Sequence, residues 1–437
     1  MVKVYCLLFV PVISALSAGS SRSLRKNIKM PDPVPPAGVA GAVRAMESGR
    51  LFRYNVASKE ASEVSKVEKE FADFTGHKFA LGLNSCGSAI FLMLKCAGVN
   101  FGDEVLTNGF TFTAVPSAIV HAGAKPVYVE TTPGYIVDVG DLEKKIDAHP
   151  NCKYFVVSHM RGKIAAMDDI KALCEAKGVL LLEDCAHSLG VLWNGGHTGH
   201  HGAMAAFSSQ SYKMLNSGEG GFFVTDDDFA HAKAMAYAGA YEVLADKHEC
   251  RPCDAALAEA MDGSIPNFSL RMHEATAAML RPQILTIEKR RAEYNERYYR
   301  IADQLRALPG VSVEEQLPEV TIVGDSVQFN VEAAALGADL DEGANAFLAK
   351  CEARGLPVER FGAATNARNF KNWKYASQPL CGLPVTADII ARAFDVRLPL
   401  LFDEEDFEVM LEIISDSLAE VAAGDLAVKE AEVAYAR

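Results

Sequence analysis

Residues 179–187 read Val-Leu-Leu-Leu-Glu-Asp-Cys-Ala-His, an apolar run that ends in two adjacent carboxylates followed by a histidine. The run has the length and composition of a buried strand in a parallel sheet, where ligands bind beyond the carboxyl ends of the strands. Because side chains alternate along a strand, Glu183 and Asp184 point to opposite faces, so only one of them can enter a site on a given side. A carboxylate at such a place needs a cationic partner. The alternative interpretation, which this segment alone leaves open, is an Asp that caps a following helix.

Outward from this strand, short apolar runs alternate with helical periodicity, which is the pattern of strand and helix units around a parallel sheet. Units of this kind are joined by right-handed crossovers. We therefore expect an α/β fold whose large domain, residues 32–290, is wound around a mostly parallel sheet. The predicted strands are residues 104–107, 126–129, 154–158, 179–182 and 222–225, and the predicted helices include residues 64–75, ended by Gly76, residues 88–96, and one around Ile170, Leu173 and Cys174.

A second, smaller domain is expected after a long helical stretch from residue 274 to about 308, which Pro282 should kink or step. The chain then predicts a strand at 326–331, a helix at 341–354, and a last helix through Phe407, Leu411 and Ile414. These elements indicate an α+β domain over residues 291–425. The Ala- and Glu-rich tail, residues 426–437, is expected to fray.

Composition excludes several classes of protein. A chain of 437 residues with 49% hydrophobic and 23% charged residues is typical of a folded globular protein. The formal net charge of −14 argues against nucleic acid or an anionic membrane as the main partner. The 10 cysteines lie mostly singly in apolar stretches, which favours a reducing compartment over a disulfide framework.

The sequence contains two clusters of possible metal ligands, and neither predicts a metal site. Cys250 and Cys253 form a single C-x-x-C without a second pair, even with His248 nearby, whereas zinc needs four ligands. The cluster of His197, His200 and His201 lies between glycines in a short connector, which is typical of a solvated loop.

The first 31 residues differ from the rest of the chain. They contain five basic residues and no acidic one, and an apolar run from Tyr5 to Leu16 is too short to span a bilayer. One hypothesis is a signal-plus-transit leader, residues 1–31, that directs the protein to an organelle. The other is a start codon assigned too far upstream of a cytoplasmic protein, with Met30 as an alternative start. Amino-terminal sequencing of the native protein distinguishes them, because a mature end at Met1 would exclude a cleaved leader.

Three further segments at the ends of short apolar runs carry chemistry. Residues 84–90, Asn-Ser-Cys-Gly-Ser-Ala-Ile, open a helix whose free N–H groups can hold a phosphate, although ordinary helix caps look the same. Residues 207–213, Phe-Ser-Ser-Gln-Ser-Tyr-Lys, precede Gly218–Gly221. A lysine partly desolvated there can lose its proton and form a Schiff base, although single lysines are more often surface groups. In residues 111–113, Thr-Phe-Thr, the ring could cap a planar cofactor or pack in the core.

Together these segments supply a phosphate cradle, an aromatic cap, an acid for a ring nitrogen and an amine for an aldehyde. Pyridoxal phosphate requires all four. The acid is needed because the cofactor withdraws electrons only while its pyridinium stays protonated.

The chain resembles the DegT/StrS family of sugar-nucleotide aminotransferases over residues 34 to 420. The segments that carry the resemblance are Ser48-Gly49-Arg50, Thr111-Phe112, residues 183–190, residues 207–213, residues 218–221, Arg271-Met272 and Leu398-Pro399-Leu400. The resemblance implies a fold type I aminotransferase that binds pyridoxal 5′-phosphate and works as a homodimer with its site at the subunit interface.

The resemblance also assigns roles to particular residues. Lys213 would hold the aldehyde of the cofactor and move the proton during transamination, and Asp184 would pair with the ring nitrogen. His187 would lie near the ring hydroxyl, and Phe112 would stack on the ring. The phosphate ligands implied are Gly87, Ser88 and Ser208.

The chain also departs from the family pattern. The family commonly has an Asn two residues before the Arg-Met pair, where this chain has Ser269, and the nearest Asn is Asn267, so the phosphate ligand from the partner subunit stays unassigned. The Gly-Thr of the phosphate loop is Cys86-Gly87 here. Residues 240–266, near which substrates are chosen, follow no family pattern.

The sequence therefore predicts an aminotransferase that moves an amino group, from glutamate, to a keto group of a nucleotide-linked sugar. Three alternatives remain: a sugar dehydratase on the same scaffold, a transaminase of a small non-sugar ketone, and a cofactor-binding protein without catalysis. The dehydratases carry histidine in place of the lysine, so Lys213 argues against the first.

Overall fold

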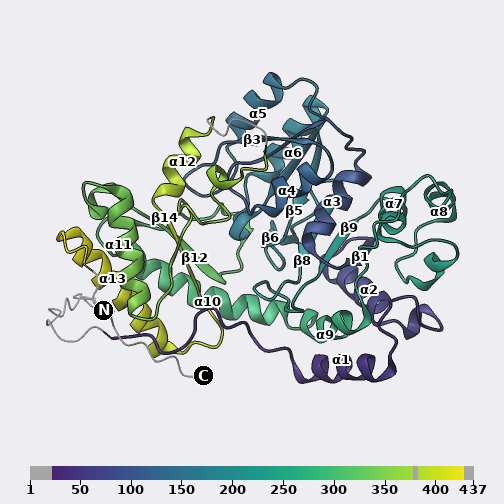
Figure 1. The fold of residues 1–437 in the computed structure, drawn as a ribbon, viewed down its shortest axis with the longest axis horizontal. Coiled ribbons are helices and arrows are strands. Elements are labelled where there is room, and N and C mark those ends of the chain that lie inside the picture. Colours follow the sequence, from purple (N-terminus) through teal and green to yellow (C-terminus); the bar gives the residue numbers. More distant parts are fainter. Residues whose placement is uncertain (1–21, 377–381, 428–437) are drawn as a thin grey trace, which may run out of the picture.

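The structure is a computed structural model in which residues 22–376 and 382–427 are described (Figure 1). Its centre is a seven-stranded sheet in the order β1-β9-β8-β5-β4-β2-β3, in which β9 alone runs antiparallel to its neighbours. The strands are β1 (Phe79–Leu83), β2 (Glu104–Asn108), β3 (Lys125–Val129), β4 (Tyr154–Ser158), β5 (Leu180–Asp184), β8 (Ala205–Ser208) and β9 (Gly221–Thr225). The predicted α/β class and mostly parallel sheet are confirmed.

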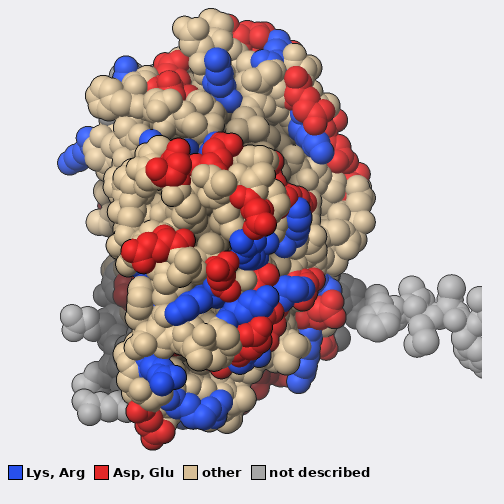
Figure 2. Space-filling view, turned by 90° about the vertical axis from the view of Figure 1, so that its right-hand side faces the viewer, with Lys and Arg blue, Asp and Glu red and all other residues tan. Residues whose placement is uncertain are grey.

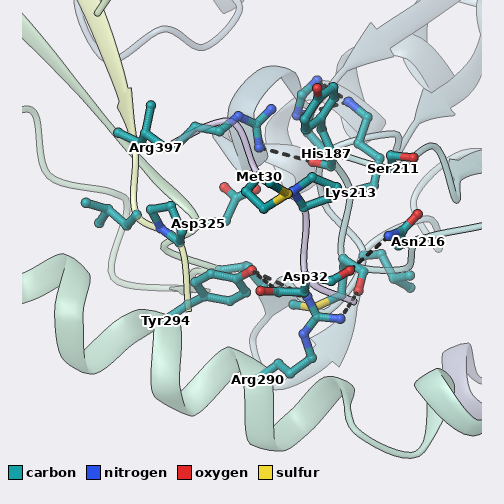
Figure 3. Close-up of a pocket in the computed structure, with 18 of the residues that line it drawn as sticks. Met30, Asp32, His187, Ser211, Lys213, Asn216, Arg290, Tyr294, Asp325 and Arg397 are labelled. Carbon is teal, nitrogen blue, oxygen red and sulfur yellow. Dashed lines mark hydrogen bonds and ion pairs between the residues drawn. The ribbon is translucent and has the colours of Figure 1, made fainter. Parts of the chain in front are cut away.

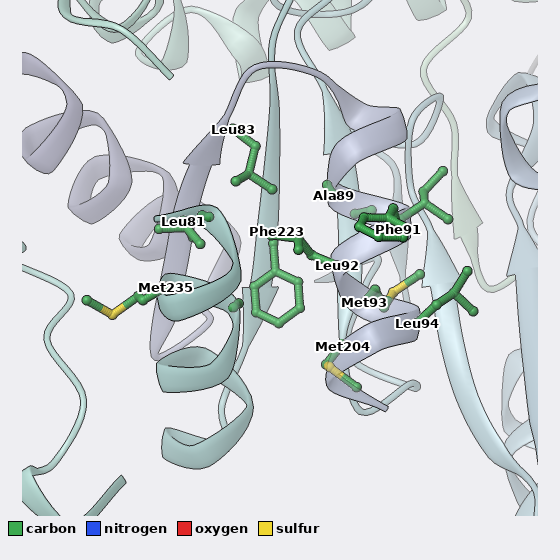
Figure 4. Packing of buried hydrophobic residues seen from close by; sticks show 14 of the residues in the cluster. Leu81, Leu83, Ala89, Phe91, Leu92, Met93, Leu94, Met204, Phe223 and Met235 are labelled. Carbon is green, nitrogen blue, oxygen red and sulfur yellow. The ribbon is translucent and has the colours of Figure 1, made fainter. Parts of the chain in front are cut away.

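Helices cover both faces of this sheet, because residues that alternate along each strand enter two different cores. On β9, Phe223 enters a core shared with α3, α4 and α7 (Figure 4), whereas Phe222 enters the core on the opposite face with α2 and α9. Helices α5 and α6 cover the remainder of that second face. The helices are α1 (Pro36–Ser48), α2 (Glu63–Thr75), α3 (Cys86–Cys96), α4 (Ala114–His121), α5 (Val139–Ala148), α6 (Met167–Lys177), α7 (Asp228–Ala238), α8 (Asp254–Ala260) and α9 (Glu274–Ile284).

Local sequence explains where these helices begin and end. The side chain of Ser62 accepts a hydrogen bond from the Ser65 N–H and so caps α2, and Gly76 ends the helix at φ +84°, a left-handed conformation that glycine adopts without strain. The predicted long helix after residue 274 is two helices, because the chain leaves helical geometry after Ile284, just past Pro282 inside α9. The second of the two is α10 (Ile287–Arg306).

The small domain packs a four-stranded antiparallel sheet, in the order β10-β12-β14-β13, against α10, α11 and α13. The predicted boundary between residues 290 and 291 falls inside α10, whose Ile287 packs in the large domain and whose Ile301 packs in the small one. The elements are β10 (Val311–Ser312), β12 (Ser326–Val331), α11 (Leu340–Ala353), β13 (Glu359–Arg360), α12 (Pro384–Ala391), β14 (Ala393–Arg397) and α13 (Glu404–Ala422). A third sheet pairs β11 (Val320–Thr321) with the hairpin β6 (Leu192–Trp193) and β7 (Gly196–His197).

The predicted leader, residues 1–31, is only partly covered by the structure, because residues 1–21 lie outside the described residues. Residues 22–31 lie along the small domain, where Leu24 and Ile28 are buried in its core. Lys26 pairs with Asp403 and Asp406 at the start of α13. The segment therefore contributes apolar surface to the folded small domain. Of the predicted tail, residues 428–437 also lie outside the described residues.

Charged side chains on the face shown in Figure 2 intermingle, and no broad basic field covers that face. Within the part of the chain that the structure describes, no helix is both long enough and apolar enough to cross a membrane. In the C-x-x-C segment, Cys250 is buried and Cys253 exposed. The histidine cluster divides among separate contacts: His197 lies against Phe74, His200 stacks on His77, and His201 pairs with Asp168.

Candidate active site

The segments singled out from the sequence meet at the carboxyl-terminal edge of the central sheet. Ser158, at the end of β4, is paired in register with Asp184 at the end of β5, and Asp184 is paired with Ala206 in β8. Ser208 ends β8, and Thr111 follows β2 and donates a hydrogen bond to the Ser158 hydroxyl over 2.7 Å. The edge therefore gathers polar side chains from four strands, at the place where doubly wound sheets bind ligands.

Strand alternation separates the two carboxylates of β5 as the sequence predicts. Glu183 accepts hydrogen bonds from His159 and from the backbone N–H groups of Gly199, His201 and Gly202. Although burial opposes ionisation, these donors lower the pKa of Glu183 to about 2. The Glu183 carboxylate is thus fully used in holding the loop after β7.

Asp184 lies on the opposite face and has fewer partners. It is 4% exposed, accepts a hydrogen bond from the Ser158 hydroxyl over 2.7 Å, and accepts another from the Ala186 N–H. Burial raises its pKa, and these two hydrogen bonds oppose the rise. No helix begins there, so Asp184 is not the helix cap that its segment left open. Within residues 22–376 and 382–427 its carboxylate forms no ion pair, and a bound cation would supply the missing charge.

Lys213 and His187 are in direct contact. The Nζ atom of Lys213 lies 2.7 Å from Nε2 of His187. Burial, together with the positive charges of Arg161, Arg397 and Arg368, lowers the pKa of Lys213 to about 7. Burial and the charge of Lys213 also hold the pKa of His187 well below its ordinary value, so the imidazole is neutral at physiological pH. An amine in this state is a nucleophile near neutral pH.

The predicted phosphate ligands lie close together around Gly221, the first residue of β9. Gly221 pairs in register with Ser208 on one side and with Leu83 on the other. A Cβ atom at Gly221 would lie 2.6 Å from the backbone nitrogen of Cys86, so only glycine allows the start of α3 to approach this closely. Gly87 and Ser88 follow in the first turn of α3. The Ser88 N–H donates to the hydroxyl of the N-cap residue Ser85 over 3.0 Å, whereas the N–H groups of Cys86 and Gly87 have no partner among the described residues and can bind an anion.

Phe112 lies just before α4, and its side chain is 40% exposed. The guanidinium of Arg368 lies over the Phe112 ring, 5.6 Å from its centroid. Phe112 is therefore a partly exposed ring at the sheet edge, as a stacking role would require.

A pocket opens beside Lys213, and most of its lining was missed by sequence reasoning (Figure 3). Arg397 lies on the same side as His187, and Asp32 lies on the other side, paired with Arg290 over 2.6 Å. Asp32 and Arg290 come from the chain before α1 and from α10, two regions without a motif. Of the residues predicted for the site, only His187 and Lys213 line this pocket.

Sequence reasoning also missed Arg161, although its position just after a predicted strand could have identified it. Arg161 follows the predicted strand 154–158 by three residues, and inspecting the end of that strand would have reached Ser158 and Arg161 together. Arg368 lies after β13 without a recognisable motif. The role of Asn267 stays unassigned, since its side-chain oxygen accepts a hydrogen bond from the Ser269 N–H in the same loop.

These residues fit pyridoxal phosphate. The buried Asp184 carboxylate matches a protonated ring nitrogen, and the Lys213 amine matches an aldehyde. The first N–H groups of α3, at Cys86 and Gly87, match a phosphate. None of the three features needs a metal ion.

Comparisons with known proteins agree with this geometry. Residues 48–408 match the model of the DegT/DnrJ/EryC1/StrS aminotransferase family. The chain is 35% identical over 208 residues to the spore coat polysaccharide biosynthesis protein SpsC of Bacillus subtilis, covering 47% of this chain and 51% of that protein. It is 33% identical over 177 residues to GDP-perosamine synthase of Caulobacter vibrioides, covering 40% and 48% of the two chains. The matched regions thus span about half the length of these curated relatives.

The fold resembles a solved structure over nearly the whole chain. The crystal structure of 3-amino-5-hydroxybenzoic acid synthase superposes with a TM-score of 0.77 at 25% identity, covering 91% of this chain and 100% of that chain. At 91% of this chain, the likeness extends well beyond the length that these curated relatives match.

Proposed function

The chain belongs to the DegT/DnrJ/EryC1/StrS aminotransferase family, a family of pyridoxal-phosphate-dependent enzymes, as its motifs predicted, and we propose that it transfers an amino group from an amino acid to a keto sugar. The donor proposed is glutamate, and the acceptor proposed is a ketone of a nucleotide-linked sugar.

One observation supports this proposal above the others. Asp184, a buried carboxylate without an ion-pair partner among the described residues, lies at the same sheet edge as Lys213, an amine whose pKa is about 7. Burying either group is unfavourable for folding, so this combination indicates a functional site.

In the proposed reaction, bound pyridoxal phosphate supplies an electron sink for the carbon that exchanges its amino group. Asp184 holds a proton on the ring nitrogen, and the Ser158 hydroxyl keeps the Asp184 carboxylate oriented. Lys213 Nζ would hold the cofactor through its aldehyde, and the same amine, once free, would take and return the proton at the reacting carbon. A pKa of about 7 suits both directions of that transfer.

The other predicted residues bind rather than react. Neutral His187 accepts a hydrogen bond from Lys213 Nζ and would lie near the ring hydroxyl of the cofactor. Gly87, Ser88 and Ser208 would hold the phosphate, and Phe112 would stack on the ring.

The nature of the acceptor is proposed from the relatives. SpsC and GDP-perosamine synthase carry names from polysaccharide and nucleotide-sugar biosynthesis. The likeness to 3-amino-5-hydroxybenzoic acid synthase leaves a small carbocyclic ketone as the second candidate acceptor.

We further propose that the chain works as a homodimer. The helix α1 exposes Val39, Val43 and Met46, which are spaced so that they share one face of the helix. A second copy would cover this apolar stripe. Sedimentation should give about twice the mass of the 47.1 kDa chain, and Val43→Asp should shift the protein towards monomer. A wild-type protein that sediments as a monomer would refute the dimer.

The proposed activity is tested by incubating the protein, reconstituted with pyridoxal phosphate, with L-glutamate and a panel of nucleotide-linked keto sugars and carbocyclic ketones. Mass spectrometry should detect the amino product from one class of ketone. Lys213→Ala should abolish the product, and Lys289→Ala, whose side chain is 79% exposed, should not change it. A Lys213→Ala protein with full turnover would refute the assignment.

A further inference from the structure

Two arginines approach each other beside the candidate active site, and neither takes part in the reaction described above. Arg161 follows β4 in the large domain, and Arg368 lies between β13 and α12. Phe361 and Phe370, which flank Arg368 in sequence, pack against Phe110 and Tyr135 of the large domain. This packing brings the Arg368 segment over the sheet edge.

Arg161 is held in an unusual state. Its backbone adopts φ +57°, a left-handed conformation that costs a non-glycine residue energy and that is concentrated at functional sites. Its side chain is 1% exposed and forms an ion pair with Asp395 of β14. The Nε and Nη1 atoms, both buried, have no hydrogen-bond partner among the described residues. A buried guanidinium with unused donors is a site prepared for an acceptor.

Arg368 shares a carboxylate with Arg161. Nη2 of Arg161 and Nη1 of Arg368 lie 3.3 Å and 2.9 Å from the same oxygen, Oε2 of Glu359. The buried Nε atom of Arg368 also has no hydrogen-bond partner in the described part of the chain. Burial and the charge of Arg161 lower the pKa of Arg368 to about 10, so it stays charged at neutral pH.

The two arginines lie next to the reacting groups. A Cβ atom on Gly162, the residue after Arg161, would lie 3.1 Å from the carbonyl oxygen of His187, whose ring contacts Lys213. Arg368 lies over the ring of Phe112. The pair thus adjoins both the amine and the aromatic ring proposed to contact the cofactor.

The charges do not cancel. Arg161 and Arg368 pair with Glu359 and Asp395, so these four charges balance. The positive charge of Arg397 also acts on Arg368, and Arg397 forms no ion pair among the described residues, which leaves one positive charge in excess. The side-chain amide of Gln328 donates a hydrogen bond of 2.8 Å to the second carboxylate oxygen of Asp395. Asp395 therefore has few acceptor positions left for a further arginine. An excess of one matches a singly charged carboxylate better than a diphosphate, and planar guanidinium groups bind carboxylates through paired hydrogen bonds.

We propose that Arg161 and Arg368 bind a carboxylate group of a reactant and that the amino-acid donor supplies it. The inference rests on the proposed function, because the proposed transamination requires an amino acid to bind at Lys213. The α-carboxylate of such a donor is one bond from the reacting carbon, so a cationic pair beside Lys213 fixes the orientation of that carbon.

Binding can be tested without turnover by using glutarate, a dicarboxylate that has no amine. Calorimetry on the holoenzyme should show that Arg161→Gln and Arg368→Gln each raise the dissociation constant of glutarate by about tenfold to hundredfold. Arg368→Lys should bind glutarate with an intermediate dissociation constant, because lysine keeps the positive charge but cannot make the paired hydrogen bonds of a guanidinium. Arg392→Gln, which removes a surface ion pair with Asp388, should bind as wild type.

Unchanged visible absorption of the bound cofactor would show that the variants keep the site intact. If Arg161→Gln does not fold, Arg368→Gln and Arg368→Lys decide the question, since the Arg368 side chain is 13% exposed and makes fewer ion pairs. Glutarate affinity that is unchanged in the folded variants would overturn the proposal.

The source of the carboxylate is tested by titrating the same variants with L-glutamate and following loss of the visible band. If the donor supplies the carboxylate, the variants should need at least about ten times more glutamate than the wild type to lose half of the visible band. Variants that lose glutarate binding but convert normally with glutamate would assign the carboxylate to the acceptor and overturn the donor assignment. If no amino acid converts the wild-type band while glutarate binding still depends on the arginines, the proposed function fails and the carboxylate site stands.

Discussion

Replacing Lys213 by Met should make the cofactor-free protein more stable at neutral pH. The structure keeps the Lys213 amine beside neutral His187, away from any carboxylate that pairs with it in the described residues. Methionine has nearly the same length and no charge, so it fits the same space without requiring a proton to be lost on folding.

The size of the effect follows from the two pKa values of the lysine. The ordinary lysine pKa of 10.5 describes the unfolded chain, and burial lowers the pKa in the folded chain to about 7. Between these values the unfolded chain binds more protons, so the stability of the wild type rises with pH. At pH 7 the neutral lysine costs roughly 4 kcal/mol by this relation, and we expect about 2 to 4 kcal/mol because water can enter the adjoining pocket.

Urea unfolding of the cofactor-free proteins measures this difference. The stability of Lys213→Met should exceed that of the wild type most at and below pH 7, and the advantage should disappear as pH rises towards 10.5, the pKa of the unfolded lysine. The control is Lys289→Met, whose side chain is 79% exposed and whose stability should match the wild type. A Lys213→Met protein that is less stable than the wild type at pH 7, or whose advantage does not change with pH, would refute the reasoning.

Further predictions concern the sheet edge and the N-terminal segment. Asp184→Asn should leave urea stability near that of the wild type and slow conversion of the bound cofactor by amino donors at least about a hundredfold. Glu183→Gln should instead lower stability by about 1 to 3 kcal/mol, because it weakens the acceptor of four hydrogen bonds. Gly221→Ala should weaken cofactor binding measured by equilibrium dialysis, because its Cβ would displace the start of α3; affinity equal to wild type would contradict this. A chain starting at residue 31 should unfold at a lower temperature than one starting at residue 22, because burying Leu24 and Ile28 contributes about 3 to 6 kcal/mol.

The sheet could be predicted because its strands are buried on both faces and read as short apolar runs. The rule that ligands bind beyond such runs identified Asp184, Ser208 and the start of α3 as neighbours, although they are far apart in the sequence. Strand alternation separated Glu183 from Asp184 correctly, and the hydrogen bonds of Glu183 explain its different task.

The pocket wall could not be predicted, because its residues are placed by tertiary packing. Asp32 reaches the pocket through an ion pair with Arg290, and neither residue belongs to a periodic pattern or motif. Arg368 owes its position to aromatic residues packed across two domains. The packing of Leu24 against the small domain was likewise hidden, since basic residues around it are typical of a targeting segment.

The most direct test of the account is the absorbance of the protein reconstituted with pyridoxal phosphate, recorded before and after excess L-glutamate. We predict a visible band from the lysine-bound cofactor that glutamate converts to the ultraviolet band of the aminated cofactor, and that is absent in Lys213→Ala. A band that no amino acid converts would contradict the proposed transamination, and a protein that forms no band would contradict the assignment of the site itself.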